Sequence, residues 1–385
     1  MNGALTAALL RHGIDDCVYL FDEPEYRLRG SWRDWDLLDA ELRKRCRGGA
    51  NDEFHPPGAA VGYFTYEGDF DFAFYPQLRA ASAREFLGER VNPALGDGEL
   101  SGWGEAIDLR QYTQMVRAAQ EYIRSGDIYQ ANLARTFVRE VRDFDAWAFF
   151  KILWSLTASP LAAYCIGADR TLLSASPELF LAIRDGRVVT KPIKGTKPRG
   201  ANDEEDRRNE ASLLASPKER AELVMITDLE RNDLGQICEY GSVRADELLV
   251  CEKLSHVFHL VSTVEGKLRE GISPVQALRA CFPGGSITGA PKKRAMEIID
   301  ELEPFERGFF TGAIGYFGYD GSAQFNIAIR TAEWRDNCLS FMTGSGITSG
   351  SDANDEFAET GHKARALKEA FAVYERLKTE IGRQK

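Results

Sequence analysis

The chain has 385 residues, of which 44% are hydrophobic, 28% charged and 11% aromatic. These fractions are typical of a folded globular protein and exclude a disordered or fibrous chain, while the length excludes a disulfide-stapled miniprotein. Forty-eight basic residues against 59 acidic ones give a formal net charge of -11, which argues against nucleic acid or an anionic membrane as the main ligand.

The cysteines and the apolar runs indicate the compartment. Seven cysteines are scattered without a CxxC pair, so we expect free thiols and no zinc site. No run approaches the roughly 20 apolar residues of a membrane-spanning helix. The opening residues MNGALTAALLRHG lack a basic lead-in, so we expect no signal peptide. Together these features predict a soluble protein of the reducing cytoplasm.

The first region, residues 1–105, is irregular. A short helix is predicted over residues 33–46 and a buried strand over residues 59–66. The glycine-rich stretch 96–104 is the best candidate for a boundary. We therefore expect an N-terminal region of residues 1–105 that packs on a catalytic unit of residues 106–385.

Beyond that boundary the local signals are clearer. Asp108 and Gln111 form a capping box, and apolar residues at helical spacing follow as far as Gly126. Residues 127–141 are strand-like, and a pair of strands is predicted over residues 161–191, turning at an Asp-Gly pair.

A second helix start lies at Ser216, where Pro217 takes the first helical position and Glu219 completes a capping box. The segment 221–229 that follows is apolar nearly all round, which predicts a buried helix. Glu222 lies within it, and an unpaired buried carboxylate costs several kcal/mol. A divalent cation shared with other carboxylates removes that cost, and oxygen ligands favour magnesium.

The last third of the chain combines strands and helices. Pro291 can start a helix that Pro304 ends, residues 309–343 form a run of antiparallel strands, and a final helix runs from about Asn354 to the C-terminus. Antiparallel blocks with helices between them predict an α+β fold.

An acidic cluster lies on the final helix. Glu356 and Glu359 are three residues apart, and Lys363 follows one turn later on the same face. A solvated face with one Glu–Lys pair explains this spacing as well as a ligand site does, so the spacing alone leaves both open.

Two basic residues raise similar alternatives. Arg330 is flanked by Ala328 and Ala332 on one face of a predicted strand, which suits either a bidentate carboxylate contact or an exposed arginine. Lys194 lies on a constrained turn in KPIKGTKPRG, either as a solvated loop residue or, in an apolar pocket, as a neutral nucleophile.

Several long motifs occur in order between about residues 108 and 372: SASPELF, PIKGTKPRG, DLERNDLG, HVFHLVSTVEG, FPGGSITGAPKKRAMEIID, FNIAIRTA, and GSGITSG followed by DEFAETGHKARAL. This series resembles the signature of the chorismate-utilising enzymes, which include anthranilate, isochorismate, salicylate and aminodeoxychorismate synthases. The resemblance implies an α/β sandwich of two antiparallel sheets with flanking helices.

The resemblance also implies roles for particular residues. Glu222, Glu356 and Glu359 match magnesium ligands, and Glu178 matches the general acid that protonates the departing C4 hydroxyl. Arg330 matches the residue that binds the enolpyruvyl carboxylate. The donors around the carboxylates match Gly344, Ser345, Gly346 and Lys363, and pocket residues match Thr196, His259 and Ser286, of which His259 joins the catalytic candidates. The family often has tyrosine at position 310, where this chain has phenylalanine.

Two positions separate the members of the family. The isochorismate and salicylate synthases carry a water-activating lysine where this chain has Gln130, and anthranilate synthases carry alanine where this chain has Lys194. Lys194 resembles the nucleophile of aminodeoxychorismate synthase. The resemblance therefore implies amination of chorismate at C4, with magnesium as cofactor and a glutamine amidotransferase subunit (component II) as the source of ammonia. Anthranilate synthase component I is the alternative, followed by an isochorismate synthase or a non-catalytic chorismate-binding member.

Overall fold

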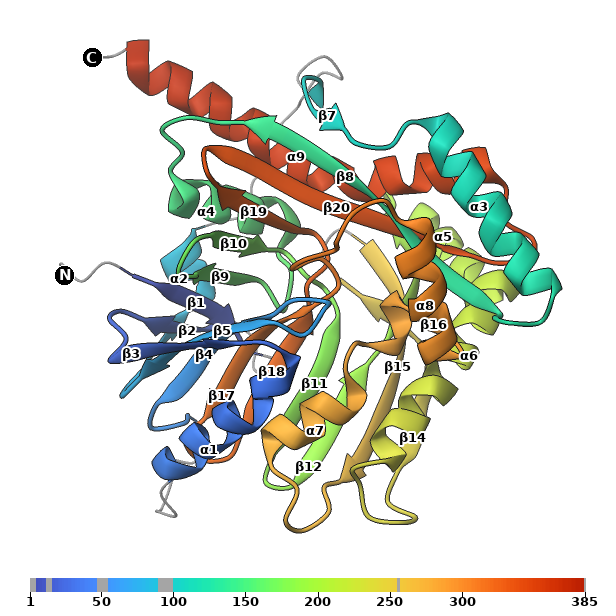
Figure 1. The fold of residues 1–385 in the computed structure, drawn as a ribbon. Helices are drawn as coiled ribbons and strands as arrows, with labels where there is room; N and C mark the ends of the chain where they lie inside the picture. Colours follow the sequence, from blue (N-terminus) through green and yellow to red (C-terminus); the bar gives the residue numbers. More distant parts are fainter. Residues whose placement is uncertain (1–4, 12–15, 47–54, 89–99, 255–256, 384–385) are drawn as a thin grey trace.

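The computed structural model describes residues 5–11, 16–46, 55–88, 100–254 and 257–383. Two ten-stranded sheets form the centre of the molecule, and every strand pair within them is antiparallel. Helices flank both sheets (Figure 1). The predicted α+β fold is confirmed.

The first sheet, sheet A, has the order β16-β8-β20-β19-β10-β9-β1-β2-β6, and β7 also pairs with β8. Its strands are β1 (Ala7–Leu10), β2 (Cys17–Phe21), β6 (Arg79–Ser82), β7 (Gly104–Glu105), β8 (Gln130–Glu140), β9 (Ala163–Ile166), β10 (Thr171–Ser174), β16 (Gly289–Ala290), β19 (Thr331–Arg335) and β20 (Cys338–Ile347).

The second sheet, sheet B, has the order β13-β15-β12-β11-β18-β17-β4-β5-β3, with β14 paired to β15. Its strands are β3 (Tyr26–Gly30), β4 (Ala59–Phe64), β5 (Phe70–Tyr75), β11 (Leu179–Arg184), β12 (Arg187–Lys191), β13 (Ile193–Pro198), β14 (Arg244–Lys253), β15 (Val257–Lys267), β17 (Ala313–Gly318) and β18 (Ala323–Ile327).

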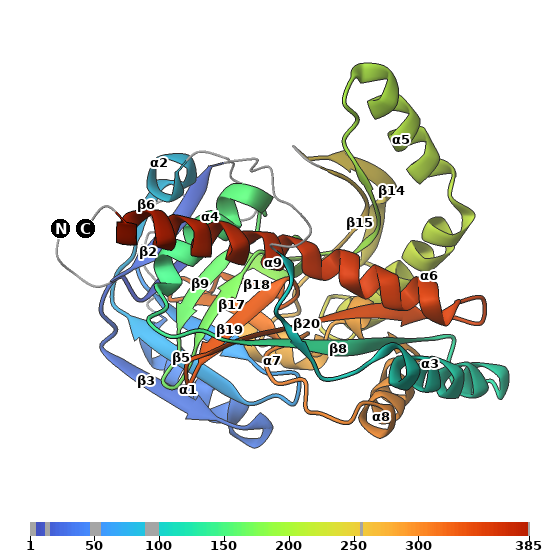
Figure 2. The same cartoon turned by 90° about the horizontal axis from the view of Figure 1, so that it is seen from above.

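The helices are α1 (Trp35–Arg45), α2 (Ala83–Leu87), α3 (Leu109–Arg124), α4 (Ala146–Thr157), α5 (Asp203–Ala215), α6 (Pro217–Gly235), α7 (Pro274–Cys281), α8 (Lys292–Leu302) and α9 (Ala353–Arg383), with short 3-10 turns η1 (Trp32–Asp34) and η3 (Gly285–Ile287). Figure 2 shows α9 lying across β20 and β8, and α5 and α6 beside β14 and β15. Within the described parts of the chain, no helix is long and apolar enough to cross a bilayer.

Three apolar clusters define the layers. One cluster lies between the sheets and joins residues of sheet A, such as Leu9 and Ala134, to residues of sheet B, such as Val61 and Ile314. The outer face of sheet A is covered by α4 and α9, and that of sheet B by α1 and α7. This layering is the α/β sandwich that the resemblance implied.

The strands of the first region are built into both sheets. Strand β1 pairs with β9 in sheet A, and β4 pairs with β17 in sheet B. Part of the expected boundary at residues 96–104 lies outside the described residues, which exclude 89–99. The division of the chain at residue 105 stays a prediction.

Two helix starts were correctly predicted from their caps. Asp108 and Gln111 form the reciprocal capping box of α3, and Ser216 caps α6 with Pro217 in its first turn. The region 161–191 holds four strands, β9 to β12, where one pair was expected. Helices α2, α4, α5 and α7 were not anticipated.

The expectation that α6 is buried all round is wrong. Val224 is 45% exposed, whereas Leu223 and Ile226 are buried. One face of the helix packs on β15, and the other faces solvent. A single exposed apolar residue such as Val224 is common on protein surfaces.

Candidate functional site

Glu178 and Lys194 meet where sheet B approaches the turn η3. Glu178 is 4% exposed at the start of β11, and its Oε1 accepts a hydrogen bond from the Ile193 backbone N–H at 3.5 Å. Lys194 Nζ donates to the backbone oxygen of Ser286 at 3.2 Å. Burial raises the pKa of Glu178, although Ser286 and Lys194 nearby partly offset the rise. A buried carboxyl group with a raised pKa beside an amine suits a general acid.

The expected turn at Lys194 is part of strand β13. The pairing of β13 with β15 shifts register between Lys194 and Thr196, and Gly195 between them has a φ of 74°. This irregularity is a local bulge, which re-aims the side chains around it.

His259 lies on β15 beside this bulge. The residue is 1% exposed, and its Nδ1 lies 2.9 Å from Thr196 Oγ1. Its Nε2 is buried and has no hydrogen-bond partner. Burial, followed by the charge of Arg330, lowers the pKa of His259 to about 4. The ring is therefore neutral at pH 7 and can offer Nε2 to a ligand.

This pKa predicts a pH-dependent stability. The unfolded histidine takes up a proton near pH 6.5, whereas the folded one does so only near pH 4. The stability that the neutral ring provides is thus present above pH 6.5 and is lost as the pH falls toward 4. We expect the unfolding free energy of the wild type to fall by about 2 kcal/mol more than that of His259→Gln between pH 7.5 and 5. Urea unfolding of both proteins measures this, and equal losses would contradict it.

Arg330 lies at a crossing between the two sheets. The chain leaves sheet B after Ile327 and enters sheet A at Thr331, and Arg330 itself has a φ of 48°. The expected strand alternation around Arg330 is therefore wrong, because the chain has left the ladder there. Burial lowers the pKa of Arg330, and the charge of Glu178 raises it. The guanidinium thus lies near Glu178, where it can bind a substrate carboxylate.

The three acidic candidates come from two helices. Glu356 is 3% exposed near the start of α9, and its carboxylate accepts hydrogen bonds from the hydroxyls of Ser345 and of Ser351, the latter at 2.7 Å. Burial would raise the pKa of Glu359, but Lys363, which pairs with it at 2.7 Å, leaves that pKa below its ordinary value. Burial raises the pKa of Glu222 on α6.

These carboxylates share their surroundings. Lys218 Nζ lies 3.6 Å from Glu356 Oε1. Burial alone would lower the pKa of Lys218, but the negative charges of Glu356, Glu222 and Glu359 raise it above its ordinary value. Glu222 Oε1 is buried without a hydrogen-bond partner. An unpartnered buried carboxylate oxygen and two further carboxylates are the donor chemistry of a hard cation. Among the described residues, however, no three His, Cys, Asp or Glu side chains gather closely enough to hold a metal ion as placed.

Strand β20 brings the glycine-rich candidates next to α9. Ser345 is buried and contacts Glu356, and Lys363 Nζ donates to the Gly344 oxygen at 2.8 Å. Gly344 and Gly346 pair with Ala134 and Asn132 on β8. Phe310 is buried with no hydroxyl to offer.

Unpartnered buried polar atoms gather among these elements. They include Gln130 Oε1, Asn132 Oδ1, Glu222 Oε1, His259 Nε2 and Ser286 Oγ. Buried polar atoms nearly always have partners in native proteins, so a group without them indicates a site that a polar ligand completes. The sequence reasoning missed Asn132, although the alternation of Gln130 and Asn132 on one strand places both on one face.

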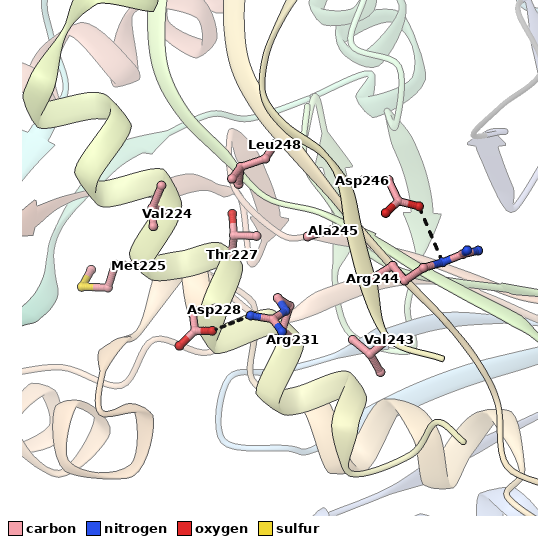
Figure 3. Close-up of a pocket in the computed structure, with 10 residues that line it drawn as sticks. All are labelled: Val224, Met225, Thr227, Asp228, Arg231, Val243, Arg244, Ala245, Asp246 and Leu248. Carbon is pink, nitrogen blue, oxygen red and sulfur yellow. Dashed lines mark hydrogen bonds and ion pairs between the residues drawn. The ribbon is translucent and has the colours of Figure 1, made fainter. Parts of the chain in front are cut away.

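A groove of about 580 Å³ lies on the other side of α6, between that helix and β14 (Figure 3). It is lined by Val224, Asp228 and Arg231 of α6 and by Leu248 of β14, among others. None of the predicted site residues lines this groove. At about 100° per residue, Glu222 lies on a different face of the helix from Val224.

Comparisons with known proteins show the family of the chain. The sequence profile of the chorismate binding enzymes matches residues 75–369. Anthranilate synthase component 1 of Saccharolobus solfataricus is 42% identical over 72% of this chain and 66% of its own length. Aminodeoxychorismate synthase component 1 of Bacillus subtilis is 42% identical over 69% of this chain and 56% of its own length. The chain thus spans less than two thirds of either relative.

A solved structure shows the same fold. Anthranilate synthase component I from Streptococcus pneumoniae superposes with a TM-score of 0.79 at 28% identity, covering 93% of both chains. The profile match covers most of the chain and includes every predicted site residue. The chain therefore belongs to the family of chorismate binding enzymes.

Proposed function

We propose that this chain catalyses the amination step of aminodeoxychorismate synthase, in which chorismate and ammonia give 4-amino-4-deoxychorismate and water. The observation that carries the proposal is Lys194, whose amine lies in the same site as Glu178. Relatives with either component 1 name are equally similar at 42% identity, so similarity alone does not choose between them. Lys194 is the residue that favours amination at C4.

The chain's own residues divide the work. Arg330 binds the enolpyruvyl carboxylate, and Ser345, Lys363 and the Gly344 and Gly346 backbone lie around the ring carboxylate. Glu178, whose pKa is raised by burial, gives its proton to the departing C4 hydroxyl. His259 and Thr196 form one wall, and Ser286 holds Lys194 through its backbone oxygen.

We further propose that Glu222, Glu356 and Glu359 hold Mg²⁺. The support is the unpartnered oxygen of Glu222 and the all-oxygen donor set. A magnesium ion would supply charge that stabilises the ring carboxylate as the hydroxyl leaves.

We propose the cytoplasm as compartment, because all seven cysteines are free. Both relatives are named component 1. We therefore propose that a glutamine amidotransferase subunit supplies ammonia to this chain as well.

Identification of the product tests the proposal. With chorismate, magnesium and an ammonium salt, mass spectrometry should find 4-amino-4-deoxychorismate and no released pyruvate. Glutamine in place of ammonium should give no product until an amidotransferase subunit is added. Fluorescent anthranilate with pyruvate would assign the chain to anthranilate synthase instead. Turnover of glutamine by the chain alone would contradict the need for a partner.

A further inference from the structure

We infer that Glu230 of α6 is a positioning residue, which holds the turn η3 and through it the amine of Lys194. The inference rests on the proposed function and extends it to a residue that no other argument assigns. Glu230 is 3% exposed, and its Oε1 accepts a hydrogen bond from the Gly285 backbone N–H at 3.1 Å. Gly285 is the first residue of η3. A buried carboxyl group of α6 is therefore bonded to the start of this turn.

The next residue of the turn binds Lys194. The backbone oxygen of Ser286 accepts a hydrogen bond from Lys194 Nζ at 3.2 Å. Two consecutive residues of η3 thus carry the donor to Glu230 and the acceptor for the lysine. The charge of Glu178 acts to raise the pKa of Glu230, which places Glu230 close to the proposed general acid as well.

The turn packs directly on the helix at Gly285. A Cβ atom at this position would stand 2.6 Å from Leu229 Cδ2 and 3.1 Å from Glu230 Oε1. Real Cβ atoms do not come within 3.0 Å of another atom, so the absence of a side chain at Gly285 permits the approach. The hydrogen bond to Glu230 depends on this close contact between η3 and α6.

A second buried group holds the last residue of the turn. Arg307 is 2% exposed, and its Nη1 donates to the Ile287 oxygen at 3.2 Å. The same guanidinium pairs with the buried carboxylate of Glu303 at 2.7 Å. The turn is therefore held at both ends, by Glu230 at its first residue and by Arg307 at its last, and the acceptor for the lysine lies between them.

Helix α6 joins this contact to the proposed metal site. Glu222 lies on the same helix, eight residues before Glu230, or about 12 Å along the helix axis. A helix behaves as a rigid element over such a length. The bond from Glu230 to η3 therefore fixes Lys194 relative to the Glu222 carboxylate, so that the nucleophile and the metal ligand have one common support.

The charged groups around Glu230 favour its neutral form. Asp233 faces it from the same helix, Lys292 from α8 and Glu178 from β11. Burial, followed by the charge of Asp233, raises the pKa of Glu230, and Lys292, which pairs with Asp233 at 2.5 Å, partly offsets the rise. A glutamine has the shape of the neutral acid and keeps an acceptor oxygen. Glu230→Gln should therefore preserve the bond to η3.

Steady-state kinetics of Glu230→Leu and Glu230→Gln test this role, with chorismate, magnesium and ammonium chloride as substrates and cofactor. Leucine is of similar size but offers no acceptor. The loss of one hydrogen bond of about 1.4 kcal/mol should lower kcat of Glu230→Leu about tenfold. Glu230→Gln should stay within about twofold of the wild type, and calorimetry should find the dissociation constant of chorismate unchanged within about twofold in both variants.

A double-mutant cycle shows whether Glu230 acts through the lysine. In the Lys194→Ala background, Glu230→Leu should lower kcat by less than about twofold, because the group that it positions is gone. Asp71→Leu is the matched control. Asp71 is a 2% exposed carboxylate that also accepts a backbone N–H, that of Ala168 at 2.7 Å, and it lies on β5, well separated from β13 in the strand order of sheet B. This control should keep the wild-type kcat.

Each outcome decides the matter. Wild-type kcat in Glu230→Leu, an equal loss in Glu230→Gln, or a further tenfold loss in the Lys194→Ala background would each overturn the inference. If Glu230→Leu melts below the assay temperature, Gly285→Ala replaces it, because the added Cβ pushes η3 off α6, and the same loss is expected. A different product with a cycle that is still non-additive refutes the proposed function and leaves the positioning role intact. A wild type without turnover of chorismate and ammonia refutes both.

Discussion

Lys194→Ala should fold normally and lose C4 amination by about 100-fold or more, a loss of at least ~2.7 kcal/mol in transition-state stabilisation. Direct replacement of the C4 hydroxyl must put nitrogen on the correct carbon and face. A covalent relay achieves this. The Lys194 amine attacks C2, the double bond shifts, and the C4 hydroxyl leaves as water with the proton of Glu178. Ammonia then attacks C4, the double bond shifts back, and the C2–N bond to Lys194 breaks.

The position of Lys194 supports the relay. The charge of Lys194 acts to lower the pKa of both Glu178 and Glu222. Its Nζ donates a hydrogen bond to a backbone oxygen of η3. No carboxylate within the described residues forms an ion pair with Lys194. Its amine is therefore not held by a carboxylate and can turn toward a bound substrate.

Two measurements separate the relay from a passive role. Wild-type protein incubated with chorismate and magnesium but without ammonia should carry an adduct at Lys194, seen by peptide mass spectrometry as chorismate less one water. Lys197→Ala is the control, because Lys197 lies on the same strand and is exposed. A Lys194→Ala enzyme that makes 4-amino-4-deoxychorismate at the wild-type rate would exclude the nucleophile role and leave the family unchanged.

Some helices were predictable from caps and prolines in the sequence. The box of Asp108 and Gln111 marked the start of α3, and Pro291 and Pro304 bracketed α8, because caps and prolines act within one turn of the chain. The burial of α6 was not predictable in this way. Val224 and Leu223 are similar in the sequence, and only packing against β15 decides which one is covered.

The candidate site residues were chosen from motifs, and spacing alone left them open. Nothing in the spacing says that Arg330 lies where the chain passes from one sheet to the other, since alternation in the sequence continues through the crossing. Asn132 was missed for a related reason. Its place in the site depends on two glycines more than 200 residues away, and only the pairing of β8 with β20 brings them together.

Glu359→Gln should lower turnover by about 10³-fold and weaken the binding of Mg²⁺ in the presence of chorismate, because a neutral amide ligand replaces a carboxylate in a site that we propose stabilises developing charge. Glu356→Gln should behave alike. The amide retains the size of the side chain, and Ser345 and Ser351 can hydrogen-bond its oxygen, so the fold should persist.

The matched control for Glu359→Gln is Glu369→Gln. Both glutamates lie on α9 and pair with a basic residue four positions away, Glu359 with Lys363 and Glu369 with Arg365. The control loses an ion pair of the same kind, worth about 0.3–0.5 kcal/mol of stability, but no candidate metal ligand. Titration calorimetry with magnesium and chorismate, followed by rates at limiting magnesium, measures the difference. If Glu359→Gln binds magnesium as tightly as Glu369→Gln does, Glu359 is not a ligand and its carboxylate serves only to hold Lys363 against the Gly344 oxygen.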